Sequence, residues 1–258
     1  MSIQKQVEEI VRQAGALIMA KRQSGFTVRR KGPIDLVTDA DREAEALITS
    51  QLQARFPDHS IFGEEQGLTG KKKAEYLWLI DPIDGTTNFA HGFPYFCTSL
   101  ALTRRGKTVF GAVYHPPTET LYTAELGGGA FKNGAPIQVS SIPEVAQSLL
   151  SAGFPYTVAQ NPQLHFQPHT KAVLASQGVL TLGSIALDLC QVAGGRLDAS
   201  WENGISSYDI AAGSLIVSEA GGKVSQIDGS RFSLESGQIL ASNGKIHQEL
   251  VQLLACKD

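Results

Sequence analysis

The sequence predicts a mixed fold of helices and strands, α+β in its first half and α/β in its second. Apolar residues in positions 1–22 follow a helical period, hairpin turn signals dominate residues 76–134, and helices alternate with short strands after about residue 145. A chain of 258 residues can bury roughly 70–75% of its unfolded surface, so the core needs no disulfides. We therefore expect one compact unit with two halves, 1–145 and 146–258.

The first half is expected to open with two helices and to continue as an antiparallel sheet. The helices are predicted at 1–22 and about 40–55, and an apolar run at 76–80 predicts a buried strand that ends at Asp81-Pro82, because proline cannot donate to a ladder. Further strands are predicted at 98–102 and 108–114, with hairpin turns at Pro116-Pro117, Gly127-Gly128-Gly129 and Lys132-Asn133-Gly134.

The second half is expected to alternate helices with short strands. Helices are predicted at 169–176, 185–193 and 210–219, and strands at 222–227 and 239–241. Strands that alternate with helices are typical of α/β architecture.

Two acids directly after the predicted 76–80 strand carry the strongest chemical signal in the chain. The run Asp81-Pro82-Ile83-Asp84-Gly85-Thr86-Thr87-Asn88-Phe89 places carboxylates at a strand end, where open sheets bind ligands. Carboxylates and a backbone carbonyl, here that of Ile83, are the ligands that Mg²⁺ prefers, and the amides after Gly85 can open a helix that faces a phosphate. The alternative is an ordinary turn, because Asp-Pro-x-Asp-Gly is also good turn chemistry.

Acids recur in three other segments, and each has a plainer interpretation. Glu64 and Glu65 follow Ile61-Phe62-Gly63 and can be a solvated loop. Asp209 precedes an apolar helix, whose dipole favours an acid there, and Asp41 lies near the cap of the second predicted helix.

Taken together, these segments resemble the signatures of the inositol monophosphatase family, in the family's order. Gly63-Glu64-Glu65, the 81–89 run and Tyr208-Asp209-Ile210-Ala211-Ala212-Gly213 carry the resemblance, and Asp35-Leu36-Val37-Thr38 and Glu219-Ala220-Gly221-Gly222 extend it over nearly the whole chain. The resemblance implies a layered αβαβα sandwich with the active site between the two halves. It also implies a Mg²⁺-dependent, lithium-sensitive phosphoric monoester hydrolase, commonly a homodimer.

The resemblance assigns roles to individual residues. Glu64, Asp81 and the Ile83 carbonyl match the ligands of a first Mg²⁺, and Asp81, Asp84 and Asp209 match those of a second. Such acids repel one another unless cations are present. Glu64 and Thr86 are expected to position and deprotonate the attacking water, with Asp41 accepting a hydrogen bond from Thr86. Asp84 borders the substrate, whose phosphate is expected to rest on the Gly85 and Thr86 amides.

The substrate side is implied by two looser segments. The segment 182–190, which contains Gly183, Ser184 and Ile185, resembles the family's Gly-Ser-Ala-Ala stretch. Trp201-Glu202-Asn203-Gly204 resembles the segment whose glutamate forms hydrogen bonds with the inositol ring. Ile185 stands where the family has a small residue and is expected to crowd the ring pocket, whereas Tyr208 keeps an aromatic wall in place of Trp. Inositol monophosphate is the predicted substrate; fructose 1,6-bisphosphate, histidinol phosphate and 3'-phosphoadenosine 5'-phosphate stay open as alternatives.

Composition narrows the remaining possibilities. A net charge of −3 argues against nucleic-acid binding, and the basic clusters Arg29-Arg30-Lys31 and Lys71-Lys72-Lys73 are expected to be solvated, although the first can add positive field near the phosphate. Cys97, Cys190 and Cys256 show neither metal nor disulfide spacing, and no run is long enough to span a membrane, so a cytoplasmic location is expected. A regulatory binding protein of the same fold is the alternative from another class.

Overall fold

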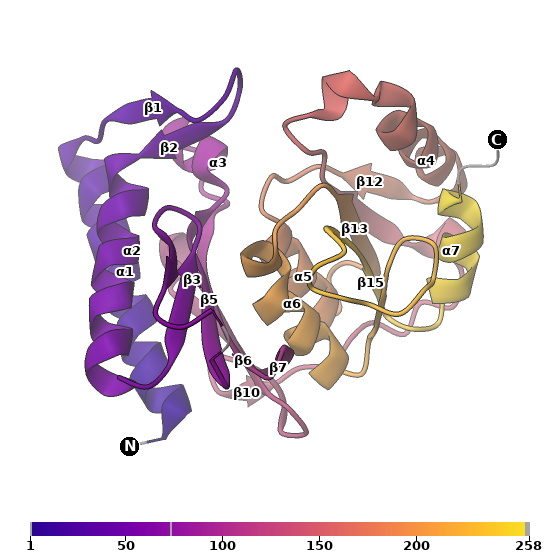
Figure 1. Ribbon diagram of the computed structural model, residues 1–258. Helices are drawn as coiled ribbons and strands as arrows, with labels where there is room; N and C mark the ends of the chain where they lie inside the picture. The colour runs from indigo at the N-terminus through magenta and orange to yellow at the C-terminus, as the bar shows by residue number, and fades with distance from the viewer. Residues whose placement is uncertain (1, 73, 256–258) are drawn as a thin grey trace.

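Two β-sheets and three pairs of helices alternate as five layers in the computed structural model, which describes residues 2–72 and 74–255 (Figure 1). The layers follow one another as α1 (Ile3–Ser24) with α2 (Asp39–Arg55), an eight-stranded sheet, α5 (Ile185–Ala193) with α6 (Ser207–Glu219), a five-stranded sheet, and α4 (Pro162–Ala175) with α7 (His247–Leu254). This order confirms the αβαβα sandwich that the family resemblance implies.

The larger sheet is built from residues 60–136 in the order β10-β9-β8-β7-β6-β5-β3-β4. Of the pairs of adjacent strands in this sheet, β3 and β5 run parallel and all the others run antiparallel. The predicted antiparallel hairpins are therefore confirmed. Its strands are β3 (Ser60–Gly63), β4 (Gly67–Thr69), β5 (Tyr76–Asp84), β6 (Cys97–Arg104), β7 (Lys107–His115), β8 (Thr120–Glu125), β9 (Gly129–Lys132) and β10 (Ala135–Pro136).

The smaller sheet has the order β12-β11-β13-β15-β14, with β11 parallel to both β12 and β13. A separate hairpin of β1 and β2 leads into α2. The remaining strands are β1 (Val28–Arg30), β2 (Leu36–Thr38), β11 (Leu149–Ala152), β12 (Gly178–Leu180), β13 (Ala199–Asn203), β14 (Lys223–Ser225) and β15 (Gln238–Ser242), and short 3₁₀ turns cover Pro116–Thr118, Val145–Gln147 and Val158–Gln160.

Strand β5 does not end at Asp81-Pro82 as predicted; it continues to Asp84. Its register against β6 shifts between Asp81 and Asp84, so a bulge accommodates Pro82, which has no amide hydrogen to offer the ladder. Gly85 then turns the chain with φ +95° into the short helix α3 (Thr86–Ala90). Both acids therefore project from the bulged end of a central strand.

Helix α4 was predicted from residue 169 but begins at Pro162. Proline is favoured in the first turn of a helix, whereas Pro168 inside the helix obscures the periodic signal. The other predicted helices agree with the structure to within a few residues.

Close packing of the middle layer positions the acid on α6. A Cβ at Gly111 of β7 would lie 2.9 Å from the Ala212 Cα, so glycine there lets α6 approach the large sheet closely. The buried side chains of α5 and α6 fill the space between the sheets, and each large one contributes roughly 1.5–3 kcal/mol of hydrophobic stabilisation.

Cys97 and Cys190 are buried free thiols. Cys256 and Lys73, which the sequence reasoning also considered, lie outside the described residues. Within residues 2–72 and 74–255, none of the helices has the length and apolar character needed to cross a membrane.

Candidate active site

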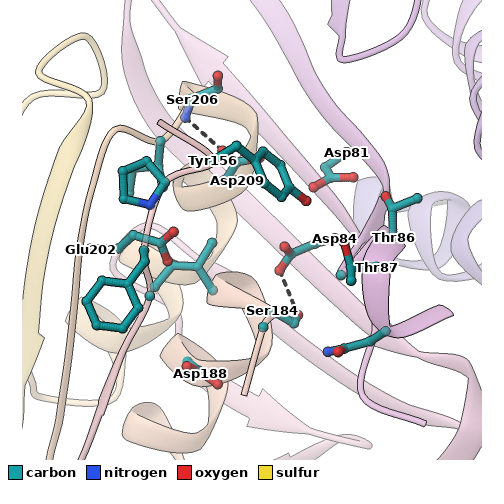
Figure 2. Close-up of a pocket in the computed structure, with 18 of the residues that line it drawn as sticks. Asp81, Asp84, Thr86, Thr87, Tyr156, Ser184, Asp188, Glu202, Ser206 and Asp209 are labelled. Atoms are coloured by element: carbon teal, nitrogen blue, oxygen red, sulfur yellow. Dashed lines mark hydrogen bonds between the residues drawn. The ribbon is translucent and has the colours of Figure 1, made fainter. Parts of the chain in front are cut away.

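A cavity of about 450 Å³ opens between the larger sheet and the middle helices and is lined from both halves of the chain (Figure 2). The bulged end of β5, the start of α3 and the turn after β3 form one side. The start of α5, strand β13, the start of α6 and residues 153–156 form the other. The acids that line it are Asp35, Glu64, Asp81, Asp84, Asp188, Glu202 and Asp209.

Asp41 is placed behind the cavity by the first turn of α2. Its Oδ2 accepts from the Thr38 amide (2.8 Å) and hydroxyl (2.6 Å), completing a capping box. Its Oδ1 lies 3.0 Å from Thr86 Oγ1, which donates to it or to the Ile83 carbonyl oxygen, also at 3.0 Å. Burial raises the pKa of Asp41 to about 6. The structure thus brings together Asp41, Thr86 and the Ile83 carbonyl.

Asp84 joins the two halves of the protein. Its Oδ2 accepts from the Ser184 hydroxyl at 2.7 Å (Figure 2). The same oxygen accepts from the Ala186 amide, also at 2.7 Å, so Asp84 anchors the start of α5. Burial raises its pKa to about 6, and the hydrogen bonds from α5 oppose the rise.

Asp209 occupies the third position of α6, where its Oδ2 accepts from the Ser206 amide at 2.7 Å in a second capping box (Figure 2). Burial and then the charge of Asp84 raise its pKa well above the usual range. Asp209 therefore caps α6, as its plainer interpretation predicted, and it also lines the cavity.

Asp81 carries a buried carboxylate oxygen that has no donor. Its side chain is 2% exposed, and its Oδ1 has no hydrogen-bond partner. Burial, followed by the charges of Glu64 and Asp84, raises its pKa well above the usual range. A buried carboxylate oxygen without a donor is costly, and a hard cation is the partner that such oxygens bind. The chemistry of this unpartnered oxygen therefore suits a divalent metal ion.

Glu64 forms an ion pair with a lysine, Lys31. It follows β3, and its Oε1 lies 2.8 Å from Lys31 Nζ, which also pairs with Glu65. Burial alone would lower the pKa of Lys31, but the two carboxylates outweigh burial and raise it. Among residues 2–72 and 74–255, no three Asp, Glu, His or Cys side chains are placed to hold one ion as they stand.

The turn that carries Glu64 rests on a buried acid that sequence reasoning missed. Glu45 of α2 accepts from the Glu65 and Gln66 amides, both at 2.8 Å. A side chain at Gly63 would overlap the Glu45 carboxylate, so glycine there lets the turn approach α2. Glu45 lies four residues after Asp41, and this helical spacing was a usable signal that both acids share one buried face.

The predicted substrate residues line the opposite wall. Glu202 projects from β13, and burial followed by the charge of Asp84 raises its pKa well above the usual range. Its carboxylate lies against Gly153, where any side chain would overlap it. Gly183 (φ +81°), Ser184 and Ile185 form the entry to α5, and Ile185 is 6% exposed.

Three further residues around the cavity were assigned no role from the sequence. Tyr95 Oη donates to Asp188 Oδ1 at 2.6 Å, and burial raises the pKa of Asp188 to about 7. Asn88 Nδ2 donates to the carbonyls of Tyr95 (2.8 Å) and Leu182 (2.7 Å), tying α3 to the second half. The bonds from Tyr95 to Asp188 and from Asn88 to Leu182 join segments that are far apart in the chain, so no local sequence pattern indicates them.

The layered sandwich with an acid-lined cavity at its centre, together with the family and the relatives that the chain matches, identifies a phosphoric monoester hydrolase. A family model described as the inositol monophosphatase family matches residues 2–257, and the chain belongs to this family. An inositol-1-monophosphatase of Synechocystis is 45% identical over 248 residues, covering 96% of this chain and 86% of that protein. The Nus factor SuhB of Pseudomonas aeruginosa is 41% identical, covering 93% and 91%. The solved inositol monophosphatase of Anabaena has a TM-score of 0.89 at 38% identity, covering 97% and 94%.

Proposed function

We propose that the protein hydrolyses inositol monophosphate with Mg²⁺ as its cofactor. The observation that carries this proposal is Asp81, a buried carboxylate with an unpartnered oxygen, set among Glu64, Asp84 and Asp209 beside the Asp41–Thr86 pair. A site with this much buried negative charge has a physical need for cations.

The proposed metal ligands are the carboxylates and one carbonyl on the sheet side of the cavity. They are Glu64, Asp81, the Ile83 carbonyl, Asp84 and Asp209. Bound Mg²⁺ would supply Lewis acidity and lower the pKa of a coordinated water. The family uses metal ions; the choice of Mg²⁺, and Li⁺ inhibition by competition with it, are our proposals, and both can be checked by titration.

The protein's own groups then orient the attacking water and the phosphate. Glu64 and Thr86 hold the water, and Glu64 accepts its proton. Asp41 fixes the Thr86 hydroxyl hydrogen, which leaves the oxygen's lone pairs for the water. The Gly85 and Thr86 amides stabilise charge that develops on the phosphate oxygens. No side-chain nucleophile is required.

The alcohol portion of the substrate is assigned to the second half. Glu202 is proposed to accept hydrogen bonds from ring hydroxyls, with Gly183, Ser184 and Ile185 forming the adjacent wall. A site that pairs substrate hydroxyls rejects analogues that lack them. The names of several relatives, including the Synechocystis inositol-1-monophosphatase, support inositol monophosphate over the other sugar and nucleotide phosphates.

We also propose a cytoplasmic homodimer. The buried free thiols Cys97 and Cys190 suit a reducing compartment. Exposed apolar side chains on α4, namely Phe166 (48%), Val173 (47%) and Leu174 (83%), supply an apolar surface that a second copy can cover. Sedimentation at micromolar concentration checks the dimer.

A regulatory binding role is the second candidate, because relatives at 40–41% identity are named Nus factor SuhB. The acid cluster favours catalysis, since a scaffold gains nothing from buried like charges. Phosphate release from inositol monophosphate, fructose 1,6-bisphosphate, histidinol phosphate and 3'-phosphoadenosine 5'-phosphate, with Mg²⁺ and with chelator, tests both roles. We expect Mg²⁺-dependent release that is fastest from inositol monophosphate. No turnover on any ester would favour the binding role.

A further inference from the structure

Tyr156 brings a phenol from the second half of the chain into the cavity. The residue lies between β11 and α4, and Figure 2 shows its hydroxyl end directed across the cavity toward Asp84. Its side chain is 51% exposed and belongs to none of the clusters of buried apolar side chains in the described part of the chain. The fold therefore gains little from this ring, which borders the open cavity instead of the core.

The residues before Tyr156 hold it in this place. The Phe154 ring packs against Phe166 of α4, with the ring centroids 5.2 Å apart. Pro155 lies so close to Gly204 that a Cβ on the glycine would come within 2.8 Å of the Pro155 Cβ. Aromatic packing and the close approach of Gly204 restrain the backbone, so a fixed segment presents the phenol to the cavity.

The Tyr156 hydroxyl lies at the phosphate end of the cavity. It interacts with the side chain of Thr87. Thr87 directly follows Gly85 and Thr86, whose amides are proposed to hold the phosphate. Glu202, which is proposed to bind the alcohol portion, lies on the wall from which Tyr156 projects, so the hydroxyl points away from it (Figure 2).

The cavity offers a phosphate group no cationic side chain of its own. Of the described residues that line it, seven are acids and none is lysine or arginine. Phosphate oxygens that do not face a metal ion must therefore accept from neutral donors, because a buried anion without donors is costly. A phenol is such a donor, since its ordinary pKa of about 10 leaves it protonated at neutral pH.

We propose that Tyr156 is a substrate-binding residue whose hydroxyl donates a hydrogen bond to the phosphate group of the substrate. The inference rests on the proposed phosphatase function and adds to it a phosphate contact from the second half of the chain. The phosphate is then held from both sides of the cavity, by the Gly85 and Thr86 amides on one side and by Tyr156 on the other. Hydrogen bonds to charged acceptors are the stronger ones, so this contact contributes measurably to affinity.

Two other roles for Tyr156 would give different results. If the hydroxyl binds the alcohol portion, its loss raises KM for the ester but leaves the affinity for inorganic phosphate unchanged. If the ring only fills the mouth of the cavity, Tyr156→Phe changes neither quantity, because it keeps the ring. Calorimetric titration with inorganic phosphate in the presence of Mg²⁺ separates these roles without any measurement of turnover.

The test compares Tyr156→Phe with the wild type and with Tyr76→Phe. Tyr76 lies at the start of β5, outside the cavity lining, where its ring stacks on His59. For Tyr156→Phe we expect the affinity for inorganic phosphate to fall about tenfold, which corresponds to about 1.4 kcal/mol, and KM for inositol monophosphate to rise by a similar factor. The affinity for Mg²⁺ alone and the melting temperature should stay at wild-type values, and Tyr76→Phe should match the wild type throughout.

An affinity for phosphate in Tyr156→Phe equal to that of the wild type would overturn the proposal, whatever happens to KM. A wild type that binds no phosphate in the presence of Mg²⁺ would overturn it as well. If the wild type binds phosphate but hydrolyses no ester, the proposed function fails, whereas the phosphate contact still stands or falls with the ratio of the two affinities. Tyr156→Leu, which also lacks the hydroxyl, replaces Tyr156→Phe if the latter does not fold.

Discussion

At Gly153 the absence of a side chain decides where the Glu202 carboxylate lies. Any Cβ at this position would overlap the carboxylate, whereas the backbone of Gly153 carries no positive φ that alanine would strain. Gly153→Ala should therefore displace Glu202 without unfolding the chain.

For Gly153→Ala we expect KM for inositol monophosphate to rise about tenfold, because weakening one polar contact with the substrate costs about 1.4 kcal/mol of binding free energy. We expect kcat to change less and the affinity for Mg²⁺ to stay the same. Steady-state kinetics and a metal titration check this. Gly178→Ala is the matched control, since a Cβ there meets Leu149 Cδ1 at an ordinary 3.4 Å. An unchanged KM in Gly153→Ala would remove Glu202 from the substrate site.

At this scale the sequence was informative where residues lie in local motifs. Asp81 and Asp84 were singled out by their place after a strand and Asp209 by the family resemblance, and all three line the cavity. Gly153 could not be singled out in this way, because it matters only through Glu202, a partner far away in the chain.

At the scale of elements, three acids of the site lie at the N-terminal ends of helices or bind to them. Asp41, Asp84 and Asp209 each use one carboxylate oxygen to satisfy donors at the start of α2, α5 and α6. The first-turn amides of a helix lack partners within the helix, so these bonds fix each acid while stabilising its helix. The same residues thus serve the fold and the cavity, which is why a plain capping interpretation of Asp41 and Asp209 was reasonable.

The β3–β4 turn shows how an element positions a site residue indirectly. Glu45→Gln should loosen this turn, because an amide side chain can accept from only one of the Glu65 and Gln66 amides and leaves the other unpaired, at a cost of roughly 1–3 kcal/mol. We expect Mg²⁺ affinity to fall about tenfold, as a cost in this range implies, and kcat to fall with it.

The matched control for Glu45→Gln is Glu43→Gln, which alters an exposed acid on the same helix. It should leave both quantities unchanged. If Glu45→Gln bound metal and turned over substrate like the wild type, the prediction would be wrong, because the β3–β4 turn would then position Glu64 without the Glu45 carboxylate.

Two elements were misjudged from the sequence for physical reasons. Proline was expected to stop β5, but a bulge absorbs it. Proline also hid the start of α4, where it occupies the first turn. The hairpins of β6 to β10 were predictable because their turn residues are local, whereas the layer order came from the family resemblance.

At the scale of the whole molecule, the cavity exists only when the two halves are docked. Asp84 and Asn88 of the first half bond to Ser184, Ala186 and Leu182 of the second. Tyr95 and Asp188 add a further bond across the same boundary. Acids buried at this boundary link folding to pH.

Asp188 gives a pH dependence whose sign can be worked out. Burial raises its folded-state pKa from 3.8 to about 7, so the folded protein binds more protons than the unfolded chain between these values. Stability from this group is therefore lost as pH rises from about 4 to about 7, and the full cost remains above that.

Asp188→Asn keeps an acceptor for Tyr95 but cannot ionise. We expect the metal-free variant to be more stable than the wild type at pH 8, by about 1–3 kcal/mol, with the difference shrinking toward pH 4. Urea unfolding at the two pH values measures it. A wild type that is equally or more stable at pH 8 would contradict the prediction.

The central claim is that Glu64, within a cation-bound acid cluster, activates a water that attacks the phosphate. Phosphate release from inositol monophosphate by the wild type and by Glu64→Gln, titrated with Mg²⁺, tests it most directly. We predict turnover by the wild type only with Mg²⁺, and a folded Glu64→Gln whose kcat is lower by about a hundredfold or more, as loss of a general base gives. Near-normal turnover by Glu64→Gln, or wild-type turnover that persists in chelator, would contradict the account.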